Sequence, residues 1–124
     1  MVIFSKDNPL SIMVDIFNEN FVIDMQGREI EVEVCFSSGM DFKGCTWFDD
    51  DGKPYLVDIE VNQTMVQILD VLAHELAHVV TGCYEDEHYH NTAWEIVYNT
   101  LHDLYCEKAN ELYDEVEAVE VKNN

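Results

Sequence analysis

The sequence has few positive charges. Among its 124 residues, 6 are Lys or Arg and 26 are Asp or Glu, which gives a formal net charge of −20 at pH 7. Such an acidic surface repels phosphate backbones and anionic membrane surfaces, so we expect no direct binding of nucleic acid or lipid. The same charge favours basic partners.

Long hydrophobic runs and a targeting signal are also missing. No apolar run approaches the roughly 18 residues that a membrane helix needs, and residues 1–10 show no basic segment followed by an apolar one. We therefore expect a cytoplasmic protein. None of the four cysteines forms a CxxC pair, which argues against a zinc ribbon and for reduced thiols. We expect three of them to be small core residues: Cys35, Cys45 and Cys106.

Repeats and linkers are absent as well, while 48% of the residues are hydrophobic. This length and composition predict one globular domain over residues 1–124. Asn8 and Pro9 are typical of a helix start and predict a short amphipathic helix over residues 8–18. Three later segments predict strands: residues 30–36, 44–48 and 55–61. The polar DDDGK stretch between the last two indicates a hairpin.

After these strands, hydrophobic residues no longer recur at every second position, as in a strand, but about every 3.6 residues, as in a helix. Thr64 and Gln67 form a capping-box pattern before an apolar stripe, and Gly82 can end that helix. Asn91 can cap a second long helix, which we expect to continue into an acidic, partly frayed tail over residues 107–124. The predicted fold class is α+β: an N-terminal helix, a three-stranded, mainly antiparallel sheet, and two helices.

The segment HELAHVV carries the chemistry. On a helix, His74 and His78 project from one face and can hold one ion, while Glu75 lies one step round. Zinc lowers the pKa of a bound water to roughly 7, and a neighbouring carboxylate can then accept the proton. Three other interpretations stay open: ordinary helix residues, a metal site that only stabilises the fold, and an enzyme that has lost its activity.

A catalytic zinc needs a third protein ligand. The candidates after the motif are Cys83, Glu85, Asp86, Glu87, His88, His90 and Glu95. HELAHVVTG, a polar loop and then HNTAW resemble the SprT-like group of small zincin metallopeptidases, in which HExxH is followed by H-G-x-x-F/W at the start of the next helix. The resemblance implies that His90, four residues before Trp94, is the third ligand. Asn91 replaces the usual glycine.

The resemblance covers about residues 44–105, and it implies a minimal zincin-like metallopeptidase. His74, His78 and His90 would bind Zn²⁺, and Glu75 would be the general base. The acidic charge argues against the DNA-linked role of the basic members, so the expected partner is a protein or peptide substrate lying extended along the sheet edge. The alternative is a non-catalytic acidic binding protein that retains a structural zinc site.

Several neighbours of the motif stay open. Asp70 lies one turn before His74 and could support that ligand, although simple exposure is the plainer interpretation. Three tyrosines could stabilise an oxyanion near zinc, but none is assigned this role: Tyr84, Tyr89 and Tyr98.

Overall fold

The computed structural model describes residues 9–82 and 90–122. Six elements follow one another along the chain: α1 (Pro9–Asn20), β1 (Glu33–Ser37), β2 (Gly44–Phe48), β3 (Pro54–Glu60), α2 (Met65–Thr81) and α3 (Thr92–Lys122). This order confirms the α+β class, with an N-terminal helix, three strands and two C-terminal helices that pack together.

The sheet is mixed, and the prediction of a mainly antiparallel sheet is wrong. Its strand order is β1-β3-β2, with β1 parallel and β2 antiparallel to β3. β2 and β3 form the predicted hairpin, while the chain passes from β1 to the opposite edge before β2 begins. Alternation of polar and apolar residues specifies the buried face of a strand and not its neighbour, which is why the pattern missed this order.

The strand predicted over residues 30–36 begins later, at Glu33. Ile30 is buried but donates its backbone N–H to the carbonyl of Val22 at 3.0 Å, and Ile23 forms an isolated bridge with Glu29. The start of the predicted strand therefore pairs with its own preceding loop. The other two strands lie within one residue of their predicted bounds.

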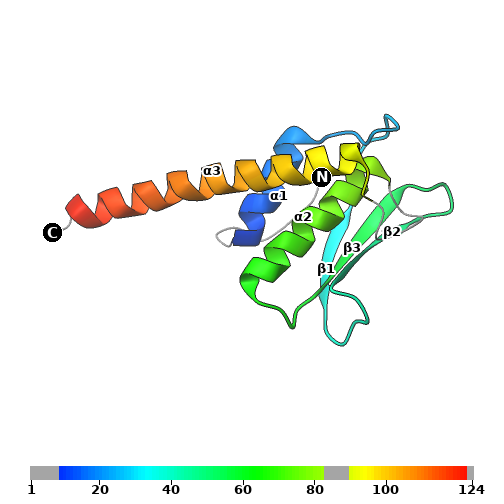
Figure 1. The fold of residues 1–124 in the computed structure, drawn as a ribbon, viewed down its shortest axis with the longest axis horizontal. Helices are drawn as coiled ribbons and strands as arrows, with labels where there is room; N and C mark the ends of the chain where they lie inside the picture. Colours follow the sequence, from blue (N-terminus) through cyan, green and yellow to red (C-terminus); the bar gives the residue numbers. More distant parts are fainter. Residues whose placement is uncertain (1–8, 83–89, 123–124) are drawn as a thin grey trace.

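Helix α2 lies between the sheet and the other two helices (Figure 1). Of the six elements, it is the one helix that contacts strands, through β2 and β3. Leu72, Leu76 and Val79 on α2 are fully buried, as are Val57 and Ile59 on β3. Because α2 is covered on both sides, its position relative to β2 is set by close packing.

The helix ends follow the local signals in the sequence. The Thr64 side chain accepts from the Gln67 backbone N–H, and the Gln67 side chain accepts from the Thr64 backbone N–H. The two bonds complete the capping box at α2. Gly82 ends α2 in the left-handed conformation with φ 68°, where a side chain would be strained. α1 continues to Asn20, two residues beyond its predicted end, and α3 continues as helix to Lys122.

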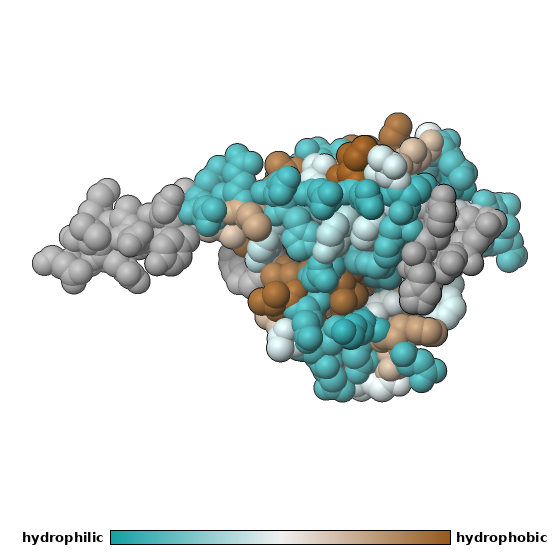
Figure 2. Space-filling view, viewed as in Figure 1, coloured by the Kyte–Doolittle hydropathy of each residue, from teal (hydrophilic) through white to brown (hydrophobic). Residues whose placement is uncertain are grey.

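α3 extends well beyond the rest of the molecule (Figure 1), and hydrophilic side chains gather along its first part on the face shown in Figure 2. None of the described helices is long and apolar enough to cross a membrane. The prediction of three core cysteines is wrong in part, because Cys45 is buried while Cys35 is half-buried and Cys106 is exposed on α3.

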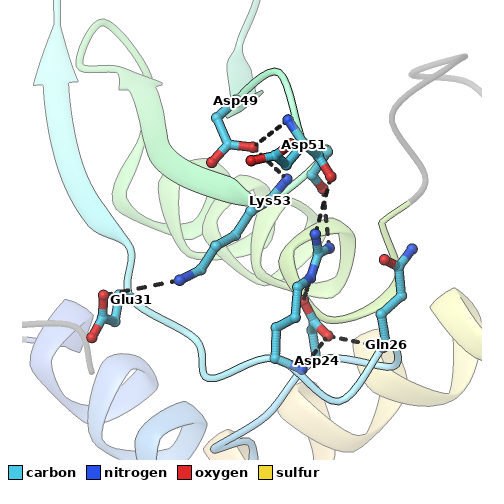
Figure 3. Close-up of polar contacts among 8 residues, drawn as sticks. Asp24, Gln26, Glu31, Asp49, Asp51 and Lys53 are labelled. Atoms are coloured by element: carbon cyan, nitrogen blue, oxygen red, sulfur yellow. Dashed lines mark hydrogen bonds and ion pairs between the residues drawn. The ribbon is translucent and has the colours of Figure 1, made fainter.

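A polar cluster joins the loop before β1 to the β2–β3 hairpin (Figure 3). Asp24 accepts from the backbone N–H groups of Gln26 and Arg28, at 2.8 and 3.0 Å, and from the Arg28 Nε at 3.0 Å. The Arg28 guanidinium also donates to the hairpin carbonyls of Asp51 and Gly52. We call these five residues the Asp24–Arg28 cluster.

The same loop also holds the end of α2. The Met25 backbone N–H, next to Asp24, donates to the Val80 carbonyl at 2.9 Å. The Asp24–Arg28 cluster and this bond together tie the end of α2 to the hairpin that carries β2.

Candidate metal centre

Three histidine side chains converge where α3 begins beside α2. His74 and His78 lie one turn apart on α2, and His90 lies two residues before the first residue of α3. The Nε2 atoms of His78 and His74 are 3.2 Å apart, and those of His90 and His74 are 3.3 Å apart. These are the three described residues that could hold a metal ion as a group.

The spacing fits a tetrahedral transition metal. Zn–N bonds of about 2.0–2.1 Å at the tetrahedral angle place neighbouring nitrogens about 3.4 Å apart, close to the two measured separations. A hydrogen bond between two neutral imidazoles could explain one such distance. It does not explain why the Nε2 atom of His74 lies this close to two other basic nitrogens, which a shared cation does explain.

His90 is held by the first turns of α3. The Asn91 side chain accepts from the Trp94 backbone N–H at 2.8 Å, the capping bond that the sequence predicts. The Trp94 ring stacks on the His90 ring, with centroids 3.8 Å apart and planes 17° from parallel. Trp94 also donates its indole N–H to the His74 backbone carbonyl at 3.2 Å, and its ring lies near those of all three histidines.

The electrostatic surroundings keep His74 in the form that binds metal. Burial and the neighbouring His90 lower the pKa of His74, while the carboxylate of Asp70 acts in the opposite direction. The net shift is downward, which favours the neutral imidazole. His78 is 3% exposed, so its ring is removed from water as well.

Glu75 lies between α2 and β2 and is 5% exposed. The Thr46 hydroxyl of β2 is 3.0 Å from the Glu75 Oε2 atom and 3.2 Å from the Glu75 backbone carbonyl. The Thr46 hydroxyl can donate its one proton either to the Glu75 carboxylate or to the Glu75 backbone carbonyl. Thr46 therefore orients the carboxylate from the strand that packs on the motif helix.

The close approach of β2 to α2 depends on Gly44. A Cβ atom at this position would lie 2.4 Å from the Cγ1 atom of Val71 and 3.2 Å from the Cγ atom of Glu75. At 2.4 Å something has to shift, either the Val71 side chain or the strand and helix themselves. Glycine at position 44 thus allows β2 to reach the metal-binding face of α2.

A cavity of about 380 Å³ opens at this place. It is lined by Phe42, Lys43, Gly44, Asp70, Val71, His74, Glu75 and His90. The wall therefore includes two histidines of the cluster, Glu75 and the first residue of the edge strand β2. A small part of an extended chain could reach all of them.

Asp70 has partners that the sequence analysis did not anticipate. Its Oδ1 atom accepts a short hydrogen bond from the Tyr98 hydroxyl and lies 3.2 Å from the His102 Nε2 atom. Tyr98 stacks on Trp94, with centroids 4.8 Å apart, and His102 packs edge-on against Tyr98. A row of rings with a spacing of four residues therefore runs along α3 from His90 to His102.

The remaining predicted candidates stand apart from this group. Glu95 is exposed in the first turn of α3 and does not belong to the three-residue group found among the described residues. Seven candidates or neighbours lie outside the described residues: Cys83, Tyr84, Glu85, Asp86, Glu87, His88 and Tyr89. Asn8, the predicted cap of α1, also lies outside them.

Sequence reasoning missed Thr46, Gly44 and His102. A hairpin register would have placed Thr46 opposite the buried Val57, where a hydroxyl needs a partner. The spacing of four residues from His90 through Trp94 and Tyr98 to His102 was readable in the sequence, and it is the signal that would have found His102.

Comparison of the chain with family models, with curated proteins and with solved structures gives no match. The site therefore stands on its own geometry. What it shows is a possible three-histidine metal site between α2 and α3.

Proposed function

We propose that this protein is a zinc-dependent metallopeptidase of the minimal zincin type. The observation that carries the proposal is the convergence of three Nε2 atoms beside a nearly buried glutamate that a neighbouring strand orients. Three nitrogen ligands leave a fourth position open, which is the arrangement of catalytic zinc sites. A purely structural zinc site usually closes that position with a fourth protein ligand.

In this proposal His74, His78 and His90 hold the ion through their Nε2 atoms. Zinc bound there supplies Lewis acidity, which makes a water molecule acidic enough to lose its proton near neutral pH. Glu75 would take that proton on its carboxylate as the water oxygen bonds to the peptide carbonyl carbon, and would pass it to the leaving amine as the C–N bond breaks. Thr46 keeps the carboxylate in position, and burial of Glu75 limits competition from bulk water.

The substrate would lie extended along β2. β2 is an edge strand of the sheet, since the order is β1-β3-β2, and its first residue lines the cavity with His74 and Glu75. An extended peptide that pairs with the open edge of β2 would bring one peptide bond to the cavity. This geometry supports a peptide as the substrate.

The resemblance to SprT-like peptidases gives separate support. His90 and Trp94, the residues that carry the second half of the motif, lie together and beside His74. Asn91, which replaces the usual glycine, accepts the capping bond of α3. The residue that departs from the family pattern, Asn91, therefore caps the helix that follows His90.

The test is a matched pair of variants in zinc-loaded protein. Glu75→Gln should keep the metal and lower peptide hydrolysis by at least about 100-fold, because it removes the base alone. Glu95→Gln makes the same substitution at an exposed position in the first turn of α3, outside the three-histidine group, and should keep both metal and activity. Cleavage of a peptide library followed by mass spectrometry measures the activity, and elemental analysis measures the metal.

The same pair separates the enzyme from the acidic binding protein. A binding protein with a structural metal has no use for Glu75 as a base, so its partner affinity should not depend on this substitution. Cleavage at the wild-type rate by Glu75→Gln would refute the peptidase mechanism.

A further inference from the structure

The cavity beside the three histidines has an acidic side chain on its wall that the proposed chemistry does not use. Asp70 lies one turn before His74 on α2 and lines the cavity. Residues four apart on a helix have Cβ atoms about 6 Å apart. A substrate group bound by Asp70 would therefore sit next to the reacting bond.

The orientation of Asp70 is set from α3. The Tyr98 hydroxyl and the His102 Nε2 atom both contact the same oxygen, Oδ1. No described residue contributes a hydrogen bond to Oδ2. Tyr98 is itself fixed by its stack on Trp94. Two donors on one oxygen hold the carboxylate plane and leave the second oxygen as an acceptor for a ligand.

The cavity wall carries one competing charge, Lys43 at the entrance to β2. Its ammonium has no hydrogen bond or ion pair to any residue in 9–82 or 90–122, so nothing described fixes its direction. A flexible Lys side chain loses conformational entropy when it binds, whereas the carboxylate of Asp70 is already oriented. The oriented charge is the better determinant of selectivity.

From these observations we propose that Asp70 is a specificity-determining residue, selecting substrates with a positively charged side chain next to the scissile bond. The substrate class is then a lysine- or arginine-containing peptide. The net charge of −20 agrees with this choice, since it attracts basic chains from a distance. This inference rests on the proposed peptidase function, because it names the substrate of the same site.

The test measures binding, so it does not require turnover. The probes are peptide hydroxamates, whose hydroxamate group binds zinc, with lysine, norleucine or glutamate beside that group. One series carries this residue on the amino-terminal side of the hydroxamate and a second on the carboxyl-terminal side. Norleucine keeps the hydrocarbon chain of lysine without the charge. Calorimetry on the zinc-loaded full chain gives the dissociation constants.

In one of the two series we expect lysine to bind roughly five- to tenfold more tightly than norleucine. This lies between the effect of an exposed ion pair and that of a buried charged hydrogen bond, because the Asp70 side chain is 55% exposed. Asp70→Asn should reduce the ratio to about one, and Asp70→Lys should make glutamate the preferred residue. Asp50→Asn removes the same charge from the exposed hairpin turn and should keep the wild-type ratio.

Tyr98→Phe removes one of the two donors to Asp70. We expect its preference for lysine over norleucine to lie between those of the wild type and Asp70→Asn.

Equal binding of lysine and norleucine by the wild type in both series overturns the inference and leaves the peptidase proposal standing. A lysine preference that persists in Asp70→Asn also overturns the inference and leaves the peptidase proposal standing. The net negative charge of the whole protein would then explain the preference. Failure of all the hydroxamates to bind zinc-loaded protein overturns both proposals. A lysine preference without any peptide hydrolysis overturns the peptidase proposal, and Asp70 then selects a bound ligand and not a substrate.

Discussion

The Asp24–Arg28 cluster and the histidine cluster are both polar groups tied to α2, but their chemistry is opposite. In the first, a carboxylate accepts three hydrogen bonds and a guanidinium donates to two carbonyls, so donors and acceptors match. In the second, three basic nitrogens approach one another. The polar groups of the first cluster are paired with one another, whereas the three nitrogens of the second cluster need a bound cation as their partner.

This difference separates a structural polar group from a functional one. Each cluster has a member that is removed from water, since the Asp24 side chain is 4% exposed and His78 is 3% exposed. Burial therefore does not distinguish them. What distinguishes them is whether the side chains satisfy one another. The comparison predicts that damage to the first cluster affects folding alone, while damage to the second affects metal binding first.

The largest expected effect is the loss of a metal ligand. His90→Ala should weaken zinc binding by several orders of magnitude, because one of three nitrogen donors is lost. His88→Ala should remain largely loaded at the same zinc level, since loss of a neighbour that is not a ligand typically costs about 10–100-fold at most. Chelator competition measures both affinities. The reverse order would transfer the role of third ligand to His88 and discredit the match to HNTAW.

The same variants test the other side of the comparison. Zinc should raise the unfolding temperature of the wild type, since a ligand that binds the folded state stabilises it. It should leave His90→Ala unchanged at the same concentration. Stabilisation of both proteins alike would mean that the ion binds elsewhere.

Next in size is the break of the Asp24–Arg28 cluster. Asp24→Ala should lower the free energy of unfolding by about 2–3 kcal/mol, because it leaves two backbone N–H groups and the Nε of the half-buried Arg28 guanidinium without their acceptor. Glu31→Ala is the control, because Glu31 forms an exposed ion pair with Lys53 at 4.0 Å in the same region (Figure 3). Such pairs contribute little. Urea denaturation of metal-free protein measures both, and equal effects would contradict the structural role of Asp24.

Local signals explain how much of the fold the sequence predicts. The capping box at Thr64, the left-handed Gly82 and the cap at Asn91 all depend on residues within four positions of one another. The sheet order depends on the pairing of β1 with the distant β3, and the late start of β1 depends on a pairing between Ile23 and Glu29 that the alternation of residues 30–36 does not reveal. Hydrophobic periodicity contains no information on such pairings, so the sheet was predicted as mainly antiparallel and the parallel pairing of β1 with β3 was missed.

The same distinction applies to the site. The spacing of His74 and His78 within one helix predicts their shared face directly. His90 could be proposed because the resemblance to a known motif supplied a long-range relation that spacing alone lacks. Thr46 and Asp70 acquire their partners through contacts of β2 and α3 with α2. Those contacts follow from the packing of whole elements and are not visible in any short stretch.

A third prediction concerns the distance between β2 and α2. Gly44→Ala should destabilise the protein by about 1–3 kcal/mol, as overpacking commonly does, because the new Cβ atom meets the Cγ1 atom of Val71 at 2.4 Å. Val71→Ala removes that atom, so the double variant should be more stable than additivity predicts. Thermal unfolding of the four proteins gives the coupling. Strictly additive effects would show that the strand moves freely.

Thr46 gives a smaller effect that appears in activity. Thr46→Val removes the hydroxyl that orients Glu75 and should lower kcat about tenfold with little change in KM. Thr46→Ser retains a hydroxyl and should recover most of the rate. Zinc content should be the same in both variants. A change confined to KM would place Thr46 in substrate binding and not in the orientation of Glu75.

The smallest effect is the pH dependence of the first cluster. Burial alone would raise the pKa of Asp24, but the backbone N–H groups of Arg28 and Gln26 and the Arg28 guanidinium outweigh it, so the pKa is lowered. A carboxylate with a lowered folded-state pKa stabilises the protein above its unfolded pKa of about 3.9, and this contribution disappears as the pH falls through the folded value. The stability difference between the wild type and Asp24→Asn should therefore be constant above about pH 5 and shrink below about pH 4. Metal-free protein must be used, since metal affinity depends on pH in its own right. A difference that stays constant down to pH 2 would mean that Asp24 acts through shape and hydrogen bonding and not through its charge. The contrast between the Asp24–Arg28 cluster, whose charges match, and the histidine cluster, which lacks a cation of its own, would then be weaker.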